Sequence, residues 1–215
     1  MPASSKARKQ LLTDFRRTEI IAAALKTFGS KGFAATRAED IAAQAGIAKG
    51  TLYLYFGSKE DIYVAAVQHA MDQLNERVRG RLQSAEGLRQ RITAFITERL
   101  EFWLEQKSLY RLVLTIGREP QHRKQTNAVL RGSKQSIVAL LEEGVAAGEL
   151  KPQPFDAIAW AALDILRGAN DRRLDGIATH SIEEDARFII DLTLQFVGYK
   201  EPGRADIRAT LRADA

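Results

Sequence analysis

The stretch "GIAKGTLYLYFGSKEDI", residues 46–62, places three aromatic side chains beside two lysines. The aromatic residues are Tyr53, Tyr55 and Phe56. In a predicted two-turn helix over 48–56, Leu52 and Phe56 fall on the side that faces a core. The remaining polar and aromatic side chains fall on the outward side. We therefore expect this helix to be half core and half binding surface.

The outward side of this helix carries groups that suit DNA. A helix N-terminus offers free N–H groups and a positive dipole, and Gly50 would let the backbone approach a ligand closely. Hydroxyl groups can donate hydrogen bonds to phosphates or touch thymine methyl groups. A tyrosine-rich surface helix with its hydroxyl groups in solvent is the alternative. The candidate DNA contacts in this segment are Lys49, Gly50, Thr51, Tyr53, Tyr55 and Lys59.

Two predicted helices precede this one. The first covers about 15–29 and has an apolar stripe of helical period. The second starts near Thr36, where "TRAE" fits a capping box in which the Thr36 hydroxyl and the Glu39 carboxylate each accept a backbone N–H. The glycine-containing turn "AGIA" then leads into the helix over 48–56. Two short helices joined by such a turn indicate a helix-turn-helix.

The positive charge of the chain is concentrated near its N-terminus. Residues 1–60 contain 10 Lys and Arg against 5 Asp and Glu, whereas residues 61–215 contain 22 of each. The whole net charge of +5 therefore lies in the first quarter of the chain. A basic module on a neutral body suggests a polyanionic partner, and a solubilising tail is the alternative.

The rest of the chain predicts an all-α protein, because long segments of helical period are separated by Gly and Pro. Residues 1–14 are expected to be a flexible basic arm and residues 201–215 a loose tail. Further helices are expected over 58–79, 87–107, 108–116, 121–148, 155–175 and 181–199.

Residues 20–67, "IIAAALKTFGSKGFAATRAEDIAAQAGIAKGTLYLYFGSKEDIYVAAV", resemble the tetracycline-repressor (TetR) family of bacterial transcriptional regulators. The resemblance is specific because five elements keep the family's order and spacing. They are the aliphatic-Phe helix, the glycine-bounded turn, "EDIAAQAGI", "KGTLYLYF" and "SKEDI". The remaining residues match the family only in being helical.

The resemblance implies a homodimer with an N-terminal helix-turn-helix domain, 15–60, that binds double-stranded operator DNA. A C-terminal domain, 61–200, would bind a small-molecule effector and form the dimer. Arg37 stands where the family often has a small hydroxyl residue, so it is a further candidate for a phosphate or base contact. The resemblance places Lys49, Gly50, Thr51 and Tyr53 in the major groove and Thr36, Tyr55 and Lys59 on phosphates.

The resemblance also suggests a mechanism. A repressor would bind a palindromic operator, and an effector between the middle helices would tilt the helix that follows "SKEDI" and release the DNA. Both a ligand-independent regulator and an activator are alternatives, as is a helical small-molecule carrier without specific DNA binding.

The last two predicted helices carry apolar stripes too wide for one helix pair to hide, which favours a four-helix bundle between two subunits. Burial within one subunit is the alternative. The candidate interface residues are Ile158, Ala162, Ile165, Phe188, Ile189, Leu192 and Phe196.

Large side chains in the middle helices could line an effector pocket or simply form core. The candidates are Phe95, Phe102, Trp103, Tyr110, Leu114 and Trp160. Four polar residues could anchor a polar group of the effector, although surface or interface positions are the simpler expectation for them. They are Arg99, Arg111, Arg167 and Asn170.

Other functions have little support. There is no Cys, and His69, His122 and His180 are isolated, so we expect no metal site and no cofactor. No glycine-rich phosphate loop follows a strand, so we do not expect an enzyme. The chain lacks an apolar run long enough for a membrane span or a signal peptide, and the absence of Cys suits a cytoplasmic protein.

Overall fold

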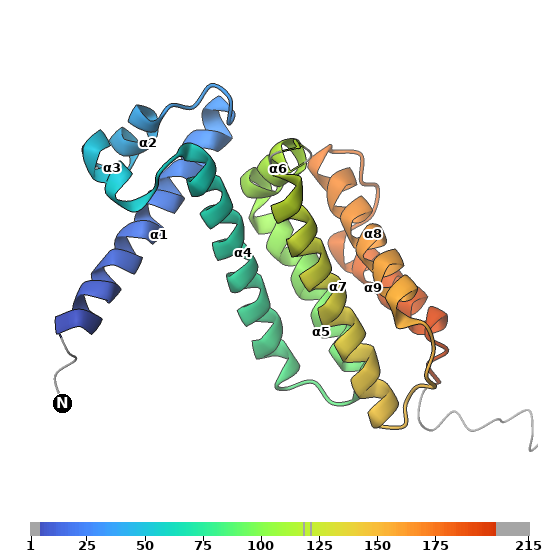
Figure 1. Ribbon diagram of the computed structural model, residues 1–215. Helices are drawn as coiled ribbons and strands as arrows, with labels where there is room; N and C mark the ends of the chain where they lie inside the picture. The colour runs from blue at the N-terminus through green and yellow to red at the C-terminus, as the bar shows by residue number, and fades with distance from the viewer. Residues whose placement is uncertain (1–4, 118, 121, 201–215) are drawn as a thin grey trace, which may run out of the picture. The chain divides into compact units, whose positions relative to one another are not determined.

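The computed structural model describes residues 5–117, 119–120 and 122–200. These residues form helices joined by turns, and no strand occurs among them, which confirms the all-α prediction (Figure 1). The expected loose tail, 201–215, and the first four residues of the expected arm lie outside the described residues. The helices are α1 (Ser5–Lys31), α2 (Ala38–Gln44), α3 (Lys49–Tyr55), α4 (Lys59–Leu82), α5 (Gly87–Glu105), α6 (Lys107–Ile116), α7 (Arg123–Ala146), α8 (Phe155–Leu174) and α9 (Ile182–Phe196).

Helix α1 is longer than the sequence suggested. It begins at Ser5, so residues 5–14, which we expected to be a flexible arm, are helical. Hydrogen bonds between residues four apart support this first part of the helix. Gln10 Nε2 donates to Asp14 at 2.9 Å, and Thr13 Oγ1 donates to the Lys9 carbonyl at 3.0 Å. The basic side chains are therefore carried on a helix.

Packing divides the chain into two units, each built from two stretches of sequence. Unit 1 combines residues 1–77 with 102–130, and unit 2 combines residues 78–101 with 131–215. Helices α4, α5 and α7 each contribute residues to both units.

Unit 1 is organised around α1, which packs against α2, α3 and α6. The shared core is apolar and includes Ile20, Ala24, Phe28, Ile41 and Leu52. A cluster of aromatic rings continues this core beyond the end of α1. Its members, linked pairwise by ring contacts of 5.0 to 6.2 Å, are Phe28, Phe33, Tyr63 and His122.

The loop between α1 and α2 is held by Lys59, the first residue of α4. Its ammonium donates to the carbonyl groups of residues 33, 34 and 36 at 2.9, 3.3 and 3.2 Å. It also lies 4.6 Å from the centre of the Phe33 ring. All three ammonium protons thus have a carbonyl acceptor, so Lys59 closes the loop.

The start of α2 differs from the expected capping box. Thr36 is buried, and its hydroxyl donates to the Gly32 carbonyl at 2.7 Å. Arg37 is the N-cap residue, and its backbone N–H donates to the Asp40 carboxylate at 2.9 Å. Only this half of a capping box forms, one residue later than we expected, because Arg37 has no side-chain acceptor and the Thr36 hydroxyl is used within the preceding turn.

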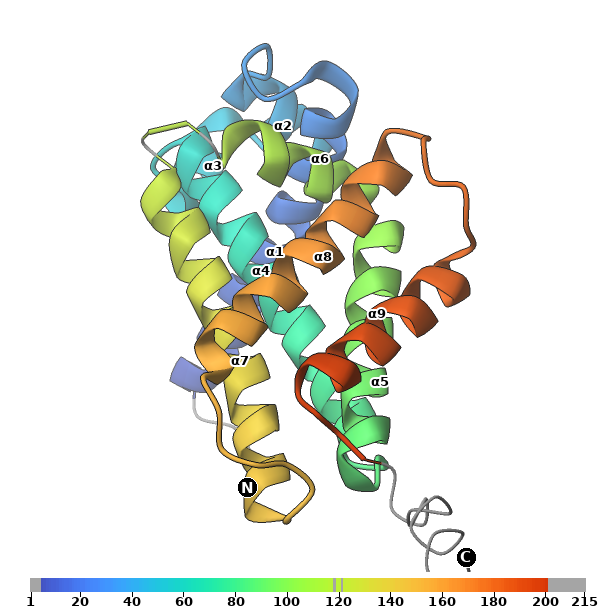
Figure 2. The ribbon, with the colours of Figure 1, turned by 90° about the vertical axis from the view of Figure 1, so that its right-hand side faces the viewer.

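Unit 2 is a helical bundle in which α8 and α9 lie against each other (Figure 2). Its core is apolar, with Leu100, Leu141 and Ala159 fully buried. Ion pairs join neighbouring helices around this core. They are Arg81–Glu98, Arg91–Glu143, Lys134–Asp156 and Arg173–Asp185.

We predict that Lys59→Met lowers the free energy of unfolding by about 1–3 kcal/mol, because three carbonyl groups lose a charged donor. Thermal melting followed by circular dichroism would measure this. Lys26→Met is the matched control, since Lys26 is exposed on α1. If Lys59 only contacted phosphate, Lys59→Met would have the melting temperature of the wild type. It would then lower the salt slope of DNA binding, which is the slope of the logarithm of the binding constant against the logarithm of the salt concentration, by about one.

Candidate functional site

Helix α3 is fixed to unit 1 by its inner side. Leu52 and Phe56 are buried, which confirms the sequence expectation for both. Arg17 on α1 clamps the end of the helix. Its guanidinium carbon lies 4.2 Å from the centre of the Phe56 ring, and one nitrogen donates to the Tyr55 carbonyl at 2.5 Å. This clamp was not expected from the sequence, because Arg17 is 38 residues from Tyr55.

The outer side of α3 is exposed and partly apolar. The Tyr53 side chain is 47% exposed and the neighbouring Leu54 is 82% exposed. A leucine so open on a short helix has no partner within unit 1 to explain it, and apolar contact with thymine methyl groups is one established use. Leu54 was not among the DNA contacts predicted from the sequence. Its position two residues from the buried Leu52 places it on the opposite side of the helix, and that spacing could have revealed it.

Lys49 begins α3 and is paired with Glu39 on α2. The two charged atoms are 2.5 Å apart, and both side chains are at least half exposed. The hydrogen bond from Lys49 lowers the pKa of the Glu39 carboxyl, and the same bond raises the pKa of Lys49. Glu39 thus holds the lysine at the entrance of the helix and places a negative charge there.

Gly50 has no structural reason to be a glycine. A Cβ atom added there would meet nothing within 4 Å, and the backbone is not in the left-handed region. Alanine would be the better helix former at this position. A glycine on the open side of a helix suits the close approach of another molecule to the backbone.

The remaining candidate DNA contacts differ in how far their side chains are exposed. Arg37 is exposed, while Thr51 and Tyr55 are partly exposed. The structure does not support the phosphate contacts predicted for Thr36 and Lys59. The Thr36 hydroxyl and the Lys59 ammonium instead donate to carbonyl groups of the α1–α2 loop. Neither side chain offers these atoms to a phosphate.

The six candidate effector contacts do not line one pocket. Phe102, Trp103 and Tyr110 form a cluster in unit 1, with ring centres 5.3 and 5.2 Å apart. Leu114 is partly exposed on α6 in unit 1, and Trp160 is partly exposed on α8 in unit 2. Phe95 alone among them lines a described cavity, in unit 2.

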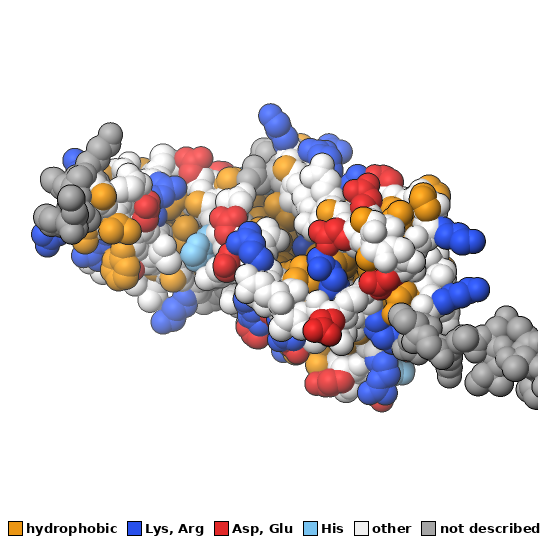
Figure 3. All heavy atoms as spheres, turned by 90° about the horizontal axis from the view of Figure 1, so that it is seen from below, with side chains coloured by type: hydrophobic (Ala, Val, Ile, Leu, Met, Phe, Trp, Pro, Cys, Tyr) orange, Lys and Arg blue, Asp and Glu red, His pale blue; other side chains and the backbone are white. Residues whose placement is uncertain are grey.

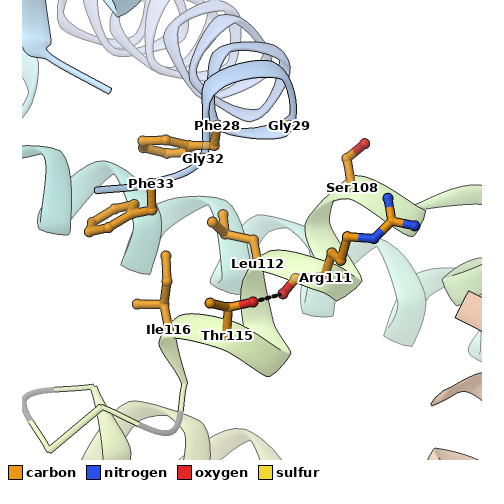
Figure 4. A pocket seen from close by; sticks show the side chains of 9 residues that line it. All are labelled: Phe28, Gly29, Gly32, Phe33, Ser108, Arg111, Leu112, Thr115 and Ile116. Atoms are coloured by element: carbon orange, nitrogen blue, oxygen red, sulfur yellow. Dashed lines mark hydrogen bonds between the residues drawn. The ribbon is translucent and has the colours of Figure 1, made fainter. Parts of the chain in front are cut away.

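Unit 1 contains a cavity of about 190 Å³ where the end of α1 meets α6 (Figure 4). Phe28, Phe33, Leu112 and Ile116 gather on one side of it, and the Arg111 guanidinium extends away from them. Beside this cavity, a Cβ atom on Gly29 would come within 3.2 Å of the Ser108 hydroxyl. The contact between α1 and α6 therefore needs a small residue at position 29.

Unit 2 contains a second cavity, whose lining surface is entirely apolar. Its volume is about 10 Å³, which is room for about one water molecule. The lining residues are Ile92, Phe95, Ile96, Ile137, Leu140, Leu141, Ala162, Leu166 and Thr193.

The candidate interface residues on α8 and α9 fall into two groups. Phe188 is 65% exposed, Phe196 is also exposed, and Leu192 between them is partly exposed. Ile189, at 2% exposure, and Ala162 are part of the unit 2 core instead. The apolar stripes are wide because they include this core, which the sequence pattern could not separate from an interface. Ile158 and Ile165 on α8 remain partly exposed.

Other surface features are ordinary. Basic and acidic side chains are interspersed on the face shown in Figure 3. No group of three His, Asp or Glu side chains suited to a metal ion occurs among the described residues. In the same part of the chain, no helix is long and apolar enough to span a membrane.

Comparisons with known proteins agree with the helix-turn-helix. Residues 20–66 match the family described as "Bacterial regulatory proteins, tetR family". The chain is 28% identical over 135 residues to the fatty acid metabolism regulator protein of Bacillus subtilis, covering 62% of this chain and 70% of that protein. It is 30% identical over 143 residues to the HTH-type transcriptional activator FasR of Mycolicibacterium smegmatis, covering 65% of each.

Solved structures share the fold over most of the chain. The fatty acid degradation regulator FadR from Bacillus halodurans superposes with a TM-score of 0.76 at 20% identity, covering 86% of this chain and 97% of that one. FadR from Bacillus subtilis, solved in complex with stearoyl-CoA, superposes with a TM-score of 0.74 at 22% identity. The match covers 82% of this chain and 96% of that one. Residues 20–66 thus carry the tetR-family domain of bacterial regulatory proteins, and the chain is similar over about two thirds of its length to bacterial transcriptional regulators.

Proposed function

We propose that this regulator binds a palindromic operator as a homodimer and that a small molecule bound in its C-terminal part changes its affinity for DNA. The observation that carries the proposal is the division of α3. Leu52 and Phe56 fix the helix to unit 1, and Tyr53 and Leu54 are left exposed beside the open Gly50. Binding to chromosomal DNA would place the protein in the cytoplasm.

In the proposed complex, α3 enters the major groove. Gly50 lets the helix backbone approach the DNA, and Tyr53 and Leu54 contact base edges and thymine methyl groups. Lys49, Thr51 and Tyr55 bind phosphates or nearby bases, and Arg37 at the start of α2 holds the flanking backbone. Thr36 and Lys59 support this surface from within, because they fix the loop that leads into α2.

The proposed dimer uses the outer side of α8 and α9. Phe188, Leu192 and Phe196 recur every four residues and so form one stripe along α9. A second copy of the chain is the partner that a self-complementary apolar stripe suits, and a two-fold dimer fits a palindrome. Two copies of α3 about 34 Å apart would read half-sites one DNA turn apart. In this proposal residues 15–60 bind DNA, and residues 61–200 bind the effector and form the dimer.

The names of the relatives suggest which effectors and which direction of regulation to test. One relative is called a fatty acid metabolism regulator, and one solved structure of similar fold holds stearoyl-CoA. Acyl compounds are therefore the first effector class to test. The 30% identical relative is called an activator, so an activating role is kept as the second candidate beside repression.

A signal from the effector would reach the DNA surface through two contacts within unit 1. The first is the close approach of Gly29 on α1 to Ser108 on α6. The second is the packing of His122 against Tyr63 on α4 and against Phe33, which belongs to the loop before α2. A small shift of α6 or α4 would move the base of the helix-turn-helix. A coupling free energy of about 1–3 kcal/mol is typical of such a mechanism.

We predict that Gly50→Ala weakens specific DNA binding although it favours the helix, because the added methyl group separates the backbone from the DNA. Fluorescence anisotropy with the protein's own upstream DNA and a scrambled duplex, at two salt concentrations, would measure this. Tyr53→Ala should abolish the preference between the two duplexes. Gly132→Ala on α7 is the control, since its added methyl group also meets open space. Unchanged binding by Gly50→Ala would show that DNA does not approach α3 there.

We predict that Glu39→Gln strengthens DNA binding to both duplexes. The change removes a negative charge beside the proposed phosphate path and frees Lys49 from its ion pair. The salt slope of binding should become steeper as Lys49 becomes available to phosphate. Glu76→Gln on α4, remote from α3 in sequence, is the control for a general loss of negative charge. Weaker binding by Glu39→Gln would show that Glu39 positions Lys49 for DNA.

We predict that the double variant Phe188→Glu, Phe196→Glu is monomeric, because four like charges would face one another across the proposed interface. Size-exclusion chromatography with light scattering would give the mass. Ile177→Glu is the matched control, because Ile177 is equally exposed but lies in the turn before α9. A dimeric double variant would place the subunit contact elsewhere.

A further inference from the structure

Arg99 on α5 is a buried cation. It lies in unit 2 and is 5% exposed. Its guanidinium carbon is 4.4 Å from the centre of the Phe95 ring, and one terminal nitrogen donates to the Ser133 hydroxyl on α7 at 3.3 Å. The Arg99 Nε atom has no hydrogen-bond partner, and no carboxylate of the described residues forms an ion pair with this side chain.

A buried arginine without a carboxylate partner is unusual, since buried charges are normally paired. Burial lowers the pKa of Arg99 to about 10, which still leaves it charged at neutral pH. Acidic groups on the same two helices are paired with other arginines, because Glu98 on α5 pairs with Arg81 and Glu143 on α7 pairs with Arg91. Arg99 is thus a buried positive charge for which the described part of the chain supplies no negative partner.

The guanidinium lies over the ring of Phe95, which lines the apolar cavity of unit 2. Phe95 and Ile96 line that cavity, and Arg99 follows them by one helical turn on the same side of α5. On α7, Ser133 precedes the lining residue Ile137 by one turn. A donor pair from two helices therefore adjoins a space lined only by apolar atoms.

We propose that Arg99 and Ser133 bind the carboxylate of an amphipathic effector whose hydrocarbon body enters the adjoining apolar cavity. This inference rests on the proposed effector role of the C-terminal part and names the chemical class of its ligand. A guanidinium can bind both oxygens of a carboxylate, and the Ser133 hydroxyl adds a third donor. The carboxylate supplies the negative charge that the protein lacks, and the apolar walls exclude water from the pair.

The buried charge and the apolar walls together favour a free carboxylate over related compounds. An alcohol of the same chain length fills the apolar walls but leaves the guanidinium unpaired. An acyl-CoA thioester is uncharged at the carbonyl that replaces the carboxylate, so it would also leave the guanidinium unpaired. Because the cavity has room for only about one water molecule, the ligand must bind a state in which α5 and α7 have moved apart.

The test is calorimetric titration of the full chain, without DNA, with octanoate, laurate and palmitate, with the matching alcohols and with lauroyl-CoA. We expect the wild type to bind at least one carboxylate more tightly than its alcohol and than lauroyl-CoA. In Arg99→Met the affinity for that carboxylate should fall roughly ten- to hundred-fold, and the preference over the alcohol should disappear. Ser133→Ala should give a smaller loss.

Two variants keep the test falsifiable. Arg131→Met removes an exposed arginine from the same helix as Ser133 and should keep the carboxylate preference. Arg99→Lys keeps the buried charge and should keep part of that preference even if Arg99→Met folds poorly. An unchanged preference in Arg99→Met, or a wild type that binds none of the carboxylates, would overturn the inference.

The titration contains no DNA, so its outcome does not depend on finding an operator. A carboxylate that binds through Arg99 but leaves operator affinity unchanged would contradict the proposed regulation and would leave the assignment of this site intact.

Discussion

The short helix α3 depends on the burial of Leu52 and Phe56. A helix of seven residues is not stable alone in water, so its position must come from packing. Each of the two buried side chains contributes about 1.5–3 kcal/mol, and Arg17 holds the end of the helix from α1. Because the inner side and this clamp supply the stability, the residues of the outer side are free to serve recognition. That division explains an exposed leucine and an unneeded glycine on the same helix.

The predictions from sequence succeeded where the relevant interactions are local. Helical period, glycine turns and the spacing of Leu52 and Phe56 are properties of short segments, so the helices and the helix-turn-helix were predictable. The roles of Thr36 and Lys59 were not, because the capping pattern contains no information about a carbonyl cluster closed by a residue 23 positions later. The exposed N-terminal part of α1 was also missed, since a basic polar segment is compatible with both an arm and a helix.

The effector part was less predictable for a physical reason. A large aromatic side chain signals burial, but it does not tell whether it lies in a filled core or beside a cavity. Phe102, Trp103 and Tyr110 pack on one another, whereas Phe95 borders the cavity of unit 2. Charge was the more informative signal. Arg99 was expected on a surface or an interface, and its burial without an acidic partner is a property that only three-dimensional contacts reveal.

The interleaved composition of unit 1 has a consequence for the construction and evolution of hybrid regulators. The segment that carries the helix-turn-helix packs with residues 102–130, which follow it only after an excursion of the chain into unit 2. A recombination that joined the first 58 residues to a foreign sensor would separate Gly29 from Ser108 and Phe33 from His122. We therefore expect functional hybrids to need a matching α6 and start of α7 together with the helix-turn-helix, although these two stretches are distant in the gene.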